Sequence, residues 1–217
     1  MKDLETWLAR VYAADGDHAT LQALYDEWAG NYDQQLWASG NPYIAIAAGF
    51  TGRLVQDFDA RILDAGCGTG NMAQILTQMG YRNIDGLDPS AGMLEVARNK
   101  QLYRQLHQLY LAQHIDLPAA SYDAVVAAGV LTHGHAPPEA LDGILGVTRD
   151  GGVILFSLSQ IAFDEFGFEQ KIGQLEASGS WRKLGQSQLF RTYPFSAEEA
   201  HLRHWVMAYQ KSADGMA

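Results

Sequence analysis

The sequence has little cysteine, few basic side chains and no long apolar run, and each shortage excludes a class of protein. Cys67 is the only cysteine among 217 residues, so the chain has no internal disulfide, as is usual in a reducing cytoplasm. Lys and Arg total 15 against 25 Asp and Glu, and the net charge of −10 disfavours partners such as nucleic acids and anionic membrane surfaces. No segment approaches the roughly 18 apolar residues of a membrane-spanning helix.

What is present indicates one globular domain. Hydrophobic residues make up 47% of the chain, which is enough for a full core and excludes a disordered protein. The first segment, MKDLETWLAR, carries charges every few residues and lacks the apolar core of a signal peptide, so we expect a cytoplasmic protein. We expect a single domain over 1–217, in which 1–57 form a helical cap or lid and 58–217 form a sheet domain. The oligomeric state is left open.

Apolar residues at helical spacing occupy the first part of the chain, and predicted strands alternate with helices after it. Apolar residues predict helices near 4–11 and 21–32, and a third that starts at Pro42, with Asn41 as its cap, and runs towards Val55. Strands are predicted at 62–66, 83–88, 108–114, 122–129 and 151–159, with helices between most of them, and a further helix is predicted at 163–178. Two last strands, 184–192 and 201–210, form an antiparallel pair. The pattern predicts an α/β fold with a Rossmann-like, doubly wound, mostly parallel sheet.

A glycine-rich turn follows the first predicted strand. Gly66, Gly68 and Gly70 stand where that strand turns into a helix, and glycine allows a sharp turn with a ligand lying against the backbone. The N-terminus of the following helix offers unpaired N–H groups and a partial positive charge. Asp88 ends the second strand, where a carboxylate can accept both hydroxyls of a ribose.

Asp64 decides between two classes of cofactor. Dinucleotide sites have the spacing G-x-G-x-x-G, whereas this turn reads G-x-G-x-G with Asp64 just before it. A carboxylate at that position would repel a pyrophosphate but suits an ammonium or sulfonium group. We therefore expect S-adenosylmethionine (SAM) rather than NAD.

These segments carry a family resemblance over residues 20–160. LDAGCGTG (63–70), GLDPSAGML (86–94) and YDAVVAAGVLTH (122–133) resemble the class I SAM-dependent methyltransferases, and LYDEWAGNYD (24–33) resembles the lid helix of members that act on small molecules. GVLTHGHAPPEAL (129–141) is similar to the subgroup named after the Williams–Beuren chromosomal region.

The resemblance implies a set of residues around the cofactor. They are Tyr32, Asp64, Ala65, Gly66, Cys67, Gly68, Gly70, Asn71, Met72, Asp88, Pro89, Met93, Gln113, His114, Ala128 and Gly129. Gln113 and His114 stand where the family usually has an Asp-Ala pair that reads the adenine amino group, and nearby Asp116 is an alternative for that role. We expect Cys67 to be a small packed residue and not a nucleophile.

The methyl acceptor is expected beside the end of the fourth strand. We predict that His133 and His135, together with Tyr25 and Trp28 of the lid, contact the acceptor. His133 is the candidate general base; the alternative is that it caps the loop or contacts the cofactor carboxylate. No carboxylate cluster accompanies the His-x-His pair, so no metal is expected.

Two further cues are interpreted as structural. Asn41-Pro42-Tyr43 resembles a signature of nucleic-acid methyltransferases, but it precedes the glycine turn and is better explained as a helix start. The remaining histidines, including His201 and His204, are predicted to be ordinary surface or sheet residues.

The sequence predicts a SAM-dependent methyltransferase that moves the sulfonium methyl group to a small-molecule acceptor by direct displacement. The alternatives are a protein or peptide methyltransferase and a protein that binds SAM without methyl transfer.

Overall fold

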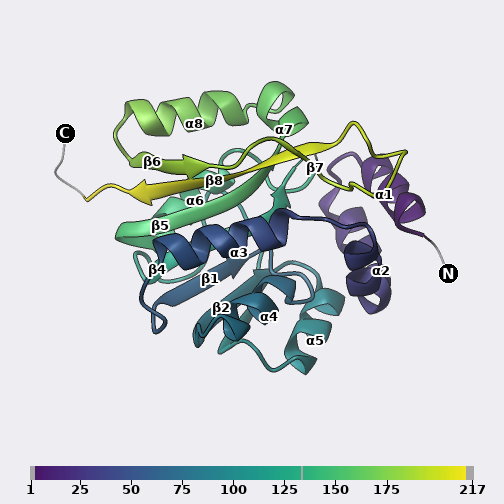
Figure 1. Cartoon of the computed structure of the whole chain (residues 1–217), viewed down its shortest axis with the longest axis horizontal. Coiled ribbons are helices and arrows are strands. Elements are labelled where there is room, and N and C mark those ends of the chain that lie inside the picture. The colour runs from purple at the N-terminus through teal and green to yellow at the C-terminus, as the bar shows by residue number, and fades with distance from the viewer. Residues whose placement is uncertain (1–2, 133, 214–217) are drawn as a thin grey trace.

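The computed structural model of the chain describes residues 3–132 and 134–213, and it is built around one eight-stranded sheet (Figure 1). Along the sheet the strand order is β3-β2-β1-β4-β5-β8-β6, with β7 also paired to β8. The parallel strands are β1 (Arg61–Ala65), β2 (Asn83–Asp88), β3 (Gln105–Gln108), β4 (Tyr122–Leu131) and β5 (Thr148–Ser159). The C-terminal strands β6 (Trp181–Gln186), β7 (Phe190–Arg191) and β8 (Arg203–Lys211) pair in antiparallel fashion. The predicted Rossmann-like α/β fold with an antiparallel C-terminal part is confirmed.

The strand order reverses between β1 and β4. The chain runs outward from β1 through β2 to β3, and then crosses to the other side of β1 to form β4. In open sheets of this kind the loops at the carboxyl ends of the two central strands separate and leave a crevice. The fold therefore places a ligand crevice beside Ala65 and Leu131, where these strands end.

Helices cover both faces of the sheet. On one face lie α3 (Tyr43–Leu54), α4 (Asn71–Gln78) and α5 (Ala91–Asn99), and on the other lie α6 (Ala140–Val147), α7 (Gln160–Glu165) and α8 (Phe168–Ala177) (Figure 1). Two buried clusters result, one on each side, and the central strands β1 and β4 contribute to both. Burial on both faces explains why these strands are nearly continuous apolar runs.

The N-terminal helices α1 (Leu4–Ala13) and α2 (His18–Ala38) form a separate layer at the carboxyl ends of the parallel strands (Figure 1). They have a hydrophobic cluster of their own, in which the rings of Trp7 and Trp28 stack with centroids 5.3 Å apart. Asp3 and Asp17 cap the two helices by accepting backbone N–H bonds from Thr6 and Thr20. Across the residues that the structure describes, no helix combines the length and apolar character needed to span a bilayer.

Three expected elements differ from the structure. The strand predicted at 108–114 is instead β3 at Gln105–Gln108, and the chain then leaves the sheet. Its apolar residues Leu111 and Ile115 are buried from a loop, against the cluster that contains α6, which explains why the alternation suggested a strand. The helix predicted at 163–178 is divided at Gly167, which adopts a φ of +81° before α8. The strand predicted at 184–192 is divided into β6 and β7.

Candidate cofactor and acceptor site

The glycine-rich turn connects β1 to α4 and is held against the end of β2. The backbone N–H groups of Gly66 and Cys67 both donate to the carbonyl oxygen of Leu87, at 2.7 and 2.9 Å. Gly66, Gly68 and Gly70 all have a positive φ, which other residues rarely adopt. A Cβ built on Gly68 would meet no atom within 4 Å, because this residue borders an open space. The turn therefore presents bare backbone to a cavity.

Asp88 lies at the end of β2 and organises the same turn. Its carboxylate accepts from the backbone N–H of Gly68 at 2.8 Å and from that of Ser90 at 2.9 Å. Each carboxylate oxygen keeps a second lone pair for another donor. Burial raises the pKa of Asp88 to about 6, although the two backbone bonds oppose this shift. A partner that donates hydrogen bonds or carries positive charge stabilises the ionised form of such a buried carboxyl group.

Asp64 is a second buried carboxyl group on the same side. Burial is the main cause that raises its pKa to about 7, and Asp88 adds to the effect. The hydroxyl of Tyr103 donates to Asp64 at 2.7 Å and lowers the pKa in part. Tyr103 reaches this point beneath the turn: a Cβ added to Gly70 or Gly86 would lie 3.1 or 3.0 Å from its ring.

Two cavities border the turn, and a third adjoins one of them. The loop cavity, of about 110 Å³, lies between Gly68, Asp88 and α2. The inner cavity, of about 30 Å³, lies at Asp64 and the start of α4. The lid cavity, of about 220 Å³, lies between α1, α2 and the start of β8. Tyr32 lines all three, and Gly129 lines both the loop cavity and the lid cavity.

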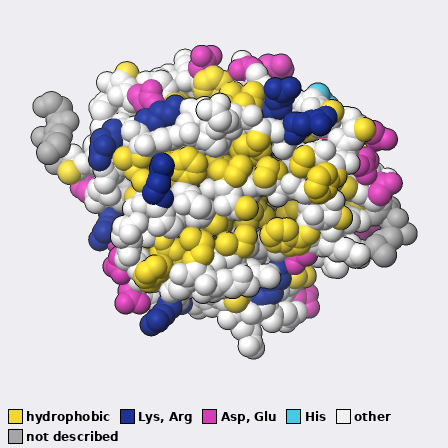
Figure 2. Space-filling view, in the orientation of Figure 1, with side chains coloured by type: hydrophobic (Ala, Val, Ile, Leu, Met, Phe, Trp, Pro, Cys, Tyr) yellow, Lys and Arg dark blue, Asp and Glu magenta, His cyan; other side chains and the backbone are white. Residues whose placement is uncertain are grey.

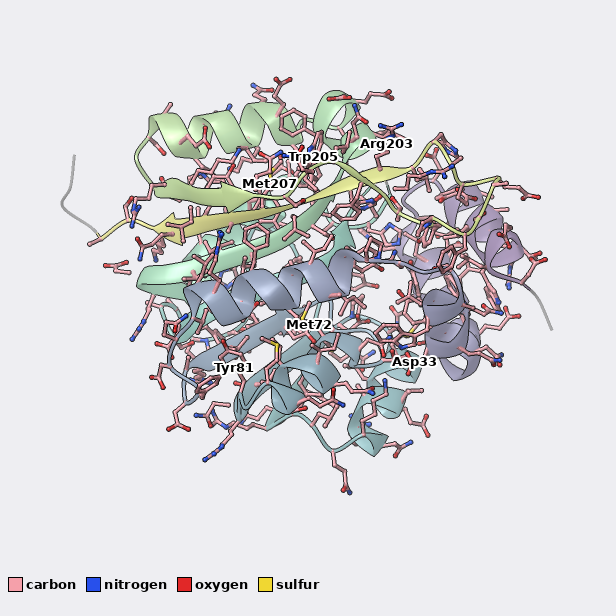
Figure 3. The ribbon with its side chains drawn as sticks, viewed as in Figure 1. Asp33, Met72, Tyr81, Arg203, Trp205 and Met207 are labelled. Carbon is pink, nitrogen blue, oxygen red and sulfur yellow. The ribbon has the colours of Figure 1, made fainter. Side chains whose placement is uncertain are left out.

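Helix α2 closes over the loop cavity through two aspartates. Asp33, whose side chain is labelled in Figure 3, comes from α2. It accepts from Thr69, Asn71 and Lys100, and the Lys100 ammonium lies 2.6 Å from its carboxylate. Asp26 accepts from the hydroxyl of Ser90 at 2.6 Å and from a backbone N–H at the start of α5 at 2.8 Å. The lid is thus fastened to the glycine-rich turn and to α5.

Two pairs of polar side chains lie at the junction between the loop cavity and the lid cavity. The Tyr25 hydroxyl lies 2.7 Å from Nε2 of His135. The hydroxyls of Tyr32 and Tyr43 interact with each other, and burial raises the pKa of Tyr43 to about 12. A Cβ on Gly129 would lie 2.6 Å from the Tyr43 hydroxyl, so this glycine is needed to admit the tyrosine. Protonated tyrosines therefore surround the passage from one cavity to the other.

Most of the residues proposed from the sequence come together here. The loop cavity is lined by Tyr32, Gly66, Gly68, Asp88, Pro89, Met93, Ala128 and Gly129. The inner cavity adds Asp64, Cys67, Asn71 and Met72. Of the proposed acceptor residues, Tyr25, Trp28 and His135 line the lid cavity. His133 lies outside the described residues.

Four proposed cofactor residues do not line these cavities. Ala65 is buried in the core under the turn, and Gly70 packs on Tyr103. Gln113 and His114 are exposed, as is the alternative Asp116. They were placed at the end of a strand that the structure does not have, and Tyr110 and Leu111 of the same loop line the loop cavity instead.

Several cavity residues were not found from the sequence. Tyr43 was interpreted only as part of a helix start, yet its hydroxyl lies at the junction. His201 and His204 were interpreted as ordinary surface or sheet residues, yet both line the lid cavity. His204 is 5% exposed, and burial lowers its pKa to about 4, so its ring is neutral at pH 7. Nothing local in the sequence distinguishes these side chains, because distant parts of the chain bring them together.

Comparison with known proteins agrees with this geometry. A family model described as a methyltransferase domain matches residues 63–156. Human methyltransferase-like protein 27 is 34% identical over 185 residues, which cover 81% of this chain and 75% of the human protein. The chain belongs to the class I SAM-dependent methyltransferases. The human relative is the Williams–Beuren-region member, as the motif at 129–141 indicated.

Two other matches show which parts of the chain resemble known proteins in sequence and in fold. A malonyl-[acyl-carrier protein] O-methyltransferase of Yersinia pestis is 34% identical over 164 residues, covering 73% of this chain but only 58% of the relative. The crystal structure of the [4+2]-cyclase SpnF superposes with a TM-score of 0.62 at 21% identity, over 78% of this chain and 81% of that one. This second likeness concerns the fold alone.

The residues of the methyltransferase fit its cofactor, SAM. The open space beside Gly68 would be filled by a Cβ, as expected where a ligand lies against the backbone. The facing carboxyl groups of Asp64 and Asp88 have raised pKa values, and SAM carries a sulfonium, an ammonium and two ribose hydroxyls. The hydroxyls of SAM can donate hydrogen bonds to these carboxyl groups, and its positive charges favour their ionised forms.

Proposed function

We propose that this methyltransferase transfers the methyl group of SAM to a small molecule by direct displacement. The observation that carries the proposal is the lid cavity, which adjoins the loop cavity at Tyr25, Tyr32, Gly129 and His135 and is closed over by α1 and α2. A cavity of about 220 Å³ between helices suits a small acceptor better than a polypeptide, which needs an open groove.

The chain's residues divide the work of binding and alignment. Asp88 would hold the ribose hydroxyls, and Asp64 would face the positively charged amino-acid end, with the bare backbone of Gly66 and Gly68 beneath. When bound, SAM supplies a methyl group on a positively charged sulfur, open to attack by an O, N, S or C nucleophile. The aromatic side chains at the junction exclude water and favour a nearby cation through their ring faces. Alignment and exclusion of water supply much of the acceleration.

We propose His133 as the general base for an acceptor that is protonated at working pH. It follows β4 by two residues, next to Thr132, which lines the lid cavity. A neutral imidazole in this position can take the proton that the acceptor loses. The alternative role, contact with the cofactor carboxylate, predicts weaker SAM binding on substitution and not slower chemistry.

We also propose that the enzyme acts in the cytoplasm and not on nucleic acid. The net charge is −10, and on the face seen in Figure 2 the described Lys and Arg side chains are scattered and do not form a broad patch. A phosphate backbone needs clustered cations to release its counterions. These features support small, non-nucleic acceptors.

A screen for product tests the proposal. Purified protein with SAM is incubated with a library of small hydroxyl, amine, thiol and activated-carbon compounds, and S-adenosylhomocysteine (SAH) and methylated products are detected by mass spectrometry. We expect at least one small acceptor to be methylated, with activity lost in Asp88→Ala. SAM binding without SAH formation from any compound, including basic peptides, would instead support a SAM-binding protein without methyl transfer. Methylation of the peptides alone would support the protein-directed alternative.

A further inference from the structure

The side chains that line the lid cavity limit the chemical class of the acceptor further than the volume of the cavity does. Its lining comes from α1, α2, α3, the ends of β4 and β5 with the residues that follow each of them, and the segment from Thr192 to His204. Among the described residues that line it, none is Lys, Arg, Asp or Glu. Rings dominate the part contributed by the lid, where Tyr25, Trp28 and Tyr32 pack edge to face or stacked.

The hydroxyl groups of this lining and the imidazole of His204 are uncharged. Nδ1 of His204 lies 2.7 Å from the hydroxyl of Thr192, and burial keeps this imidazole uncharged above a pH of about 4. Thr132 donates to Ser159 at 3.3 Å, and Tyr25 pairs with His135. Such groups can donate or accept one hydrogen bond, but they offer no counterion to a charged acceptor.

A buried carboxyl group, Glu199, lies beside this lining; burial raises its pKa, and the lining residue His201 lowers that pKa in part. Glu199 is 7% exposed and accepts from the hydroxyl of Tyr12, a lining residue, at 3.3 Å. Its carboxylate raises the pKa of Tyr12, as does burial of the phenol. An anionic acceptor would therefore be buried without a Lys or Arg partner among the described lining residues and close to the Glu199 carboxylate, which is unfavourable. A cation would be drawn to Glu199 only through the intervening phenol, and a protonated amine has no lone pair for methyl transfer.

We infer that the lid cavity takes an uncharged, aromatic or otherwise apolar acceptor of one or two rings, oriented by single hydrogen bonds to neutral side chains such as His204. The inference rests on the proposed function, because it names the substrate class of the same site. The rings of Tyr25 and Trp28 stack on one another, and with Tyr32 they give the lid side of the cavity an aromatic surface that suits an aromatic acceptor. The neutral nucleophile, a phenol or an uncharged aryl amine or thiol, reaches the junction at Gly129.

Binding to the SAH complex tests the inference without a requirement for turnover. The SAH-saturated protein is titrated with 2-naphthol, 2-naphthoate and 2-naphthylmethylammonium by calorimetry at pH 7.5. These probes share one ring system and differ in charge. We expect 2-naphthol to bind at least tenfold more tightly than either charged probe.

A tryptophan substitution that fills the lid cavity tests whether 2-naphthol binds there. Leu202 is half-buried and lines the lid cavity, whereas Leu184 is half-buried on β6 and does not line it. Leu202→Trp should reduce 2-naphthol binding at least tenfold and leave SAH affinity unchanged, and Leu184→Trp should leave both unchanged. If Leu202→Trp fails to fold, as shown by lost SAH binding, Ile161→Trp replaces it in the same cavity.

Four results would overturn the inference about the acceptor, and one would overturn the proposed function instead. Weak or absent 2-naphthol binding, a charged probe that binds as tightly, or binding that survives the filling variant would overturn the inference. Methylation of anionic acceptors in the screen would overturn it as well, while leaving the proposed function intact. Tight 2-naphthol binding without methyl transfer to any acceptor would support the cavity assignment and remove the proposed function.

Discussion

Asp64 and Asp88 face the same group of cavities with pKa values raised to about 7 and about 6. The burial that raises both values penalises the ionised forms in the free protein. SAM brings positive charge to this place, so its binding should favour the ionised forms and lower both pKa values. A ligand that lowers a pKa releases protons on binding, and its affinity then rises with pH through the pKa of the free protein.

We therefore predict that SAM affinity increases between pH 5.5 and pH 7.5, with proton release measured by calorimetry in buffers of different ionisation heat. Tyr103→Phe removes a bond that lowers the pKa of Asp64 and should shift the rise to higher pH. Tyr122→Phe is the matched control, because Tyr122 donates to Asp85 away from the cavities. Affinity that is constant over this range, or proton uptake on binding, would contradict the assignment.

Asp88→Ala should weaken SAM binding by about 2–3 kcal/mol, or roughly 30- to 150-fold, because two ribose hydroxyls lose a charged acceptor. The loop is also affected, since Asp88 holds the backbone of Gly68 and Ser90. The Asp88→Asn variant separates these effects, because it retains an acceptor oxygen for one backbone bond. Calorimetry that gave the parental affinity for Asp88→Ala would place the ribose elsewhere.

His133→Ala should lower kcat roughly 10²- to 10⁴-fold and leave SAM affinity nearly unchanged, provided the histidine is the general base. The parent rate should then rise with pH through one ionisation, because only the neutral imidazole accepts a proton. These measurements follow once the screen supplies an acceptor. Parental kcat in the variant would eliminate the base, and weakened SAM binding would favour contact with the cofactor carboxylate.

The site residues predictable from sequence are those tied to one local motif. Gly66, Gly68 and Asp88 stand at strand ends that a short apolar run identifies, so their place in the fold follows from the motif alone. His204 reaches the lid cavity only through the pairing of β8, and Tyr103 reaches Asp64 only through the path of the chain after α5. No spacing in the sequence encodes those contacts.

At the scale of elements, the lid helix α2 is attached by side chains that the sequence did not single out. Asp33 joins it to the glycine-rich turn and to Lys100. The ion pair is partly buried, with side-chain exposures of 20% for Lys100 and 33% for Asp33. Its contribution to the closed position exceeds that of an exposed pair, because three donors converge on one carboxylate.

We predict that Asp33→Ala loosens the lid, speeds SAH release and weakens SAM binding roughly 5- to 30-fold by losing bonds worth about 1–2 kcal/mol. Stopped-flow release and hydrogen exchange of residues 18–38 measure the effect. Asp142→Ala is the control, because its pair with Lys171 has similar exposure, 30% and 17%, and lies on α6 and α8. Equal release rates for the two variants would mean that Asp33 does not hold the lid.

Strands buried on both faces were predictable, and the edge of the sheet was not. β4 and β5 contain long apolar runs and β1 a shorter one, whereas β2 is marked by Ile84 and Leu87 before Asp88; the expected bounds of all four agree with the structure within a few residues. β3 has only β2 as a partner, and its residues Gln105 and Gln108 are exposed, so no apolar run marks it. The apolar residues that follow are buried by tertiary packing, which the local pattern could not separate from strand burial.

At the scale of the whole molecule, the alternation of elements predicted the fold class, but not the order β5-β8-β6 at the C-terminal edge. That order places the start of β8 beside the lid, so His204 faces the lid cavity. The lid cluster of α1 and α2 is separate from the two sheet clusters and contacts the rest mainly around the cavities. Ligand binding therefore stabilises the attachment of one layer to the other.

SAM and SAH should raise the melting temperature of cofactor-free protein, because both bind the native state and not the unfolded chain. At 100 times the Kd the stabilisation is about 2.7 kcal/mol, or roughly 5–10 °C for a chain of this length. The shift with SAM should be larger at pH 7.5 than at pH 6, since ionised Asp64 and Asp88 bind the cation more tightly. At the same ligand concentration Asp88→Ala, weakened about 100-fold, retains about 0.4 kcal/mol and a shift of roughly 1 °C. A parent protein whose melting temperature does not move with saturating SAM or SAH would contradict the placement of the cofactor at these two carboxylates.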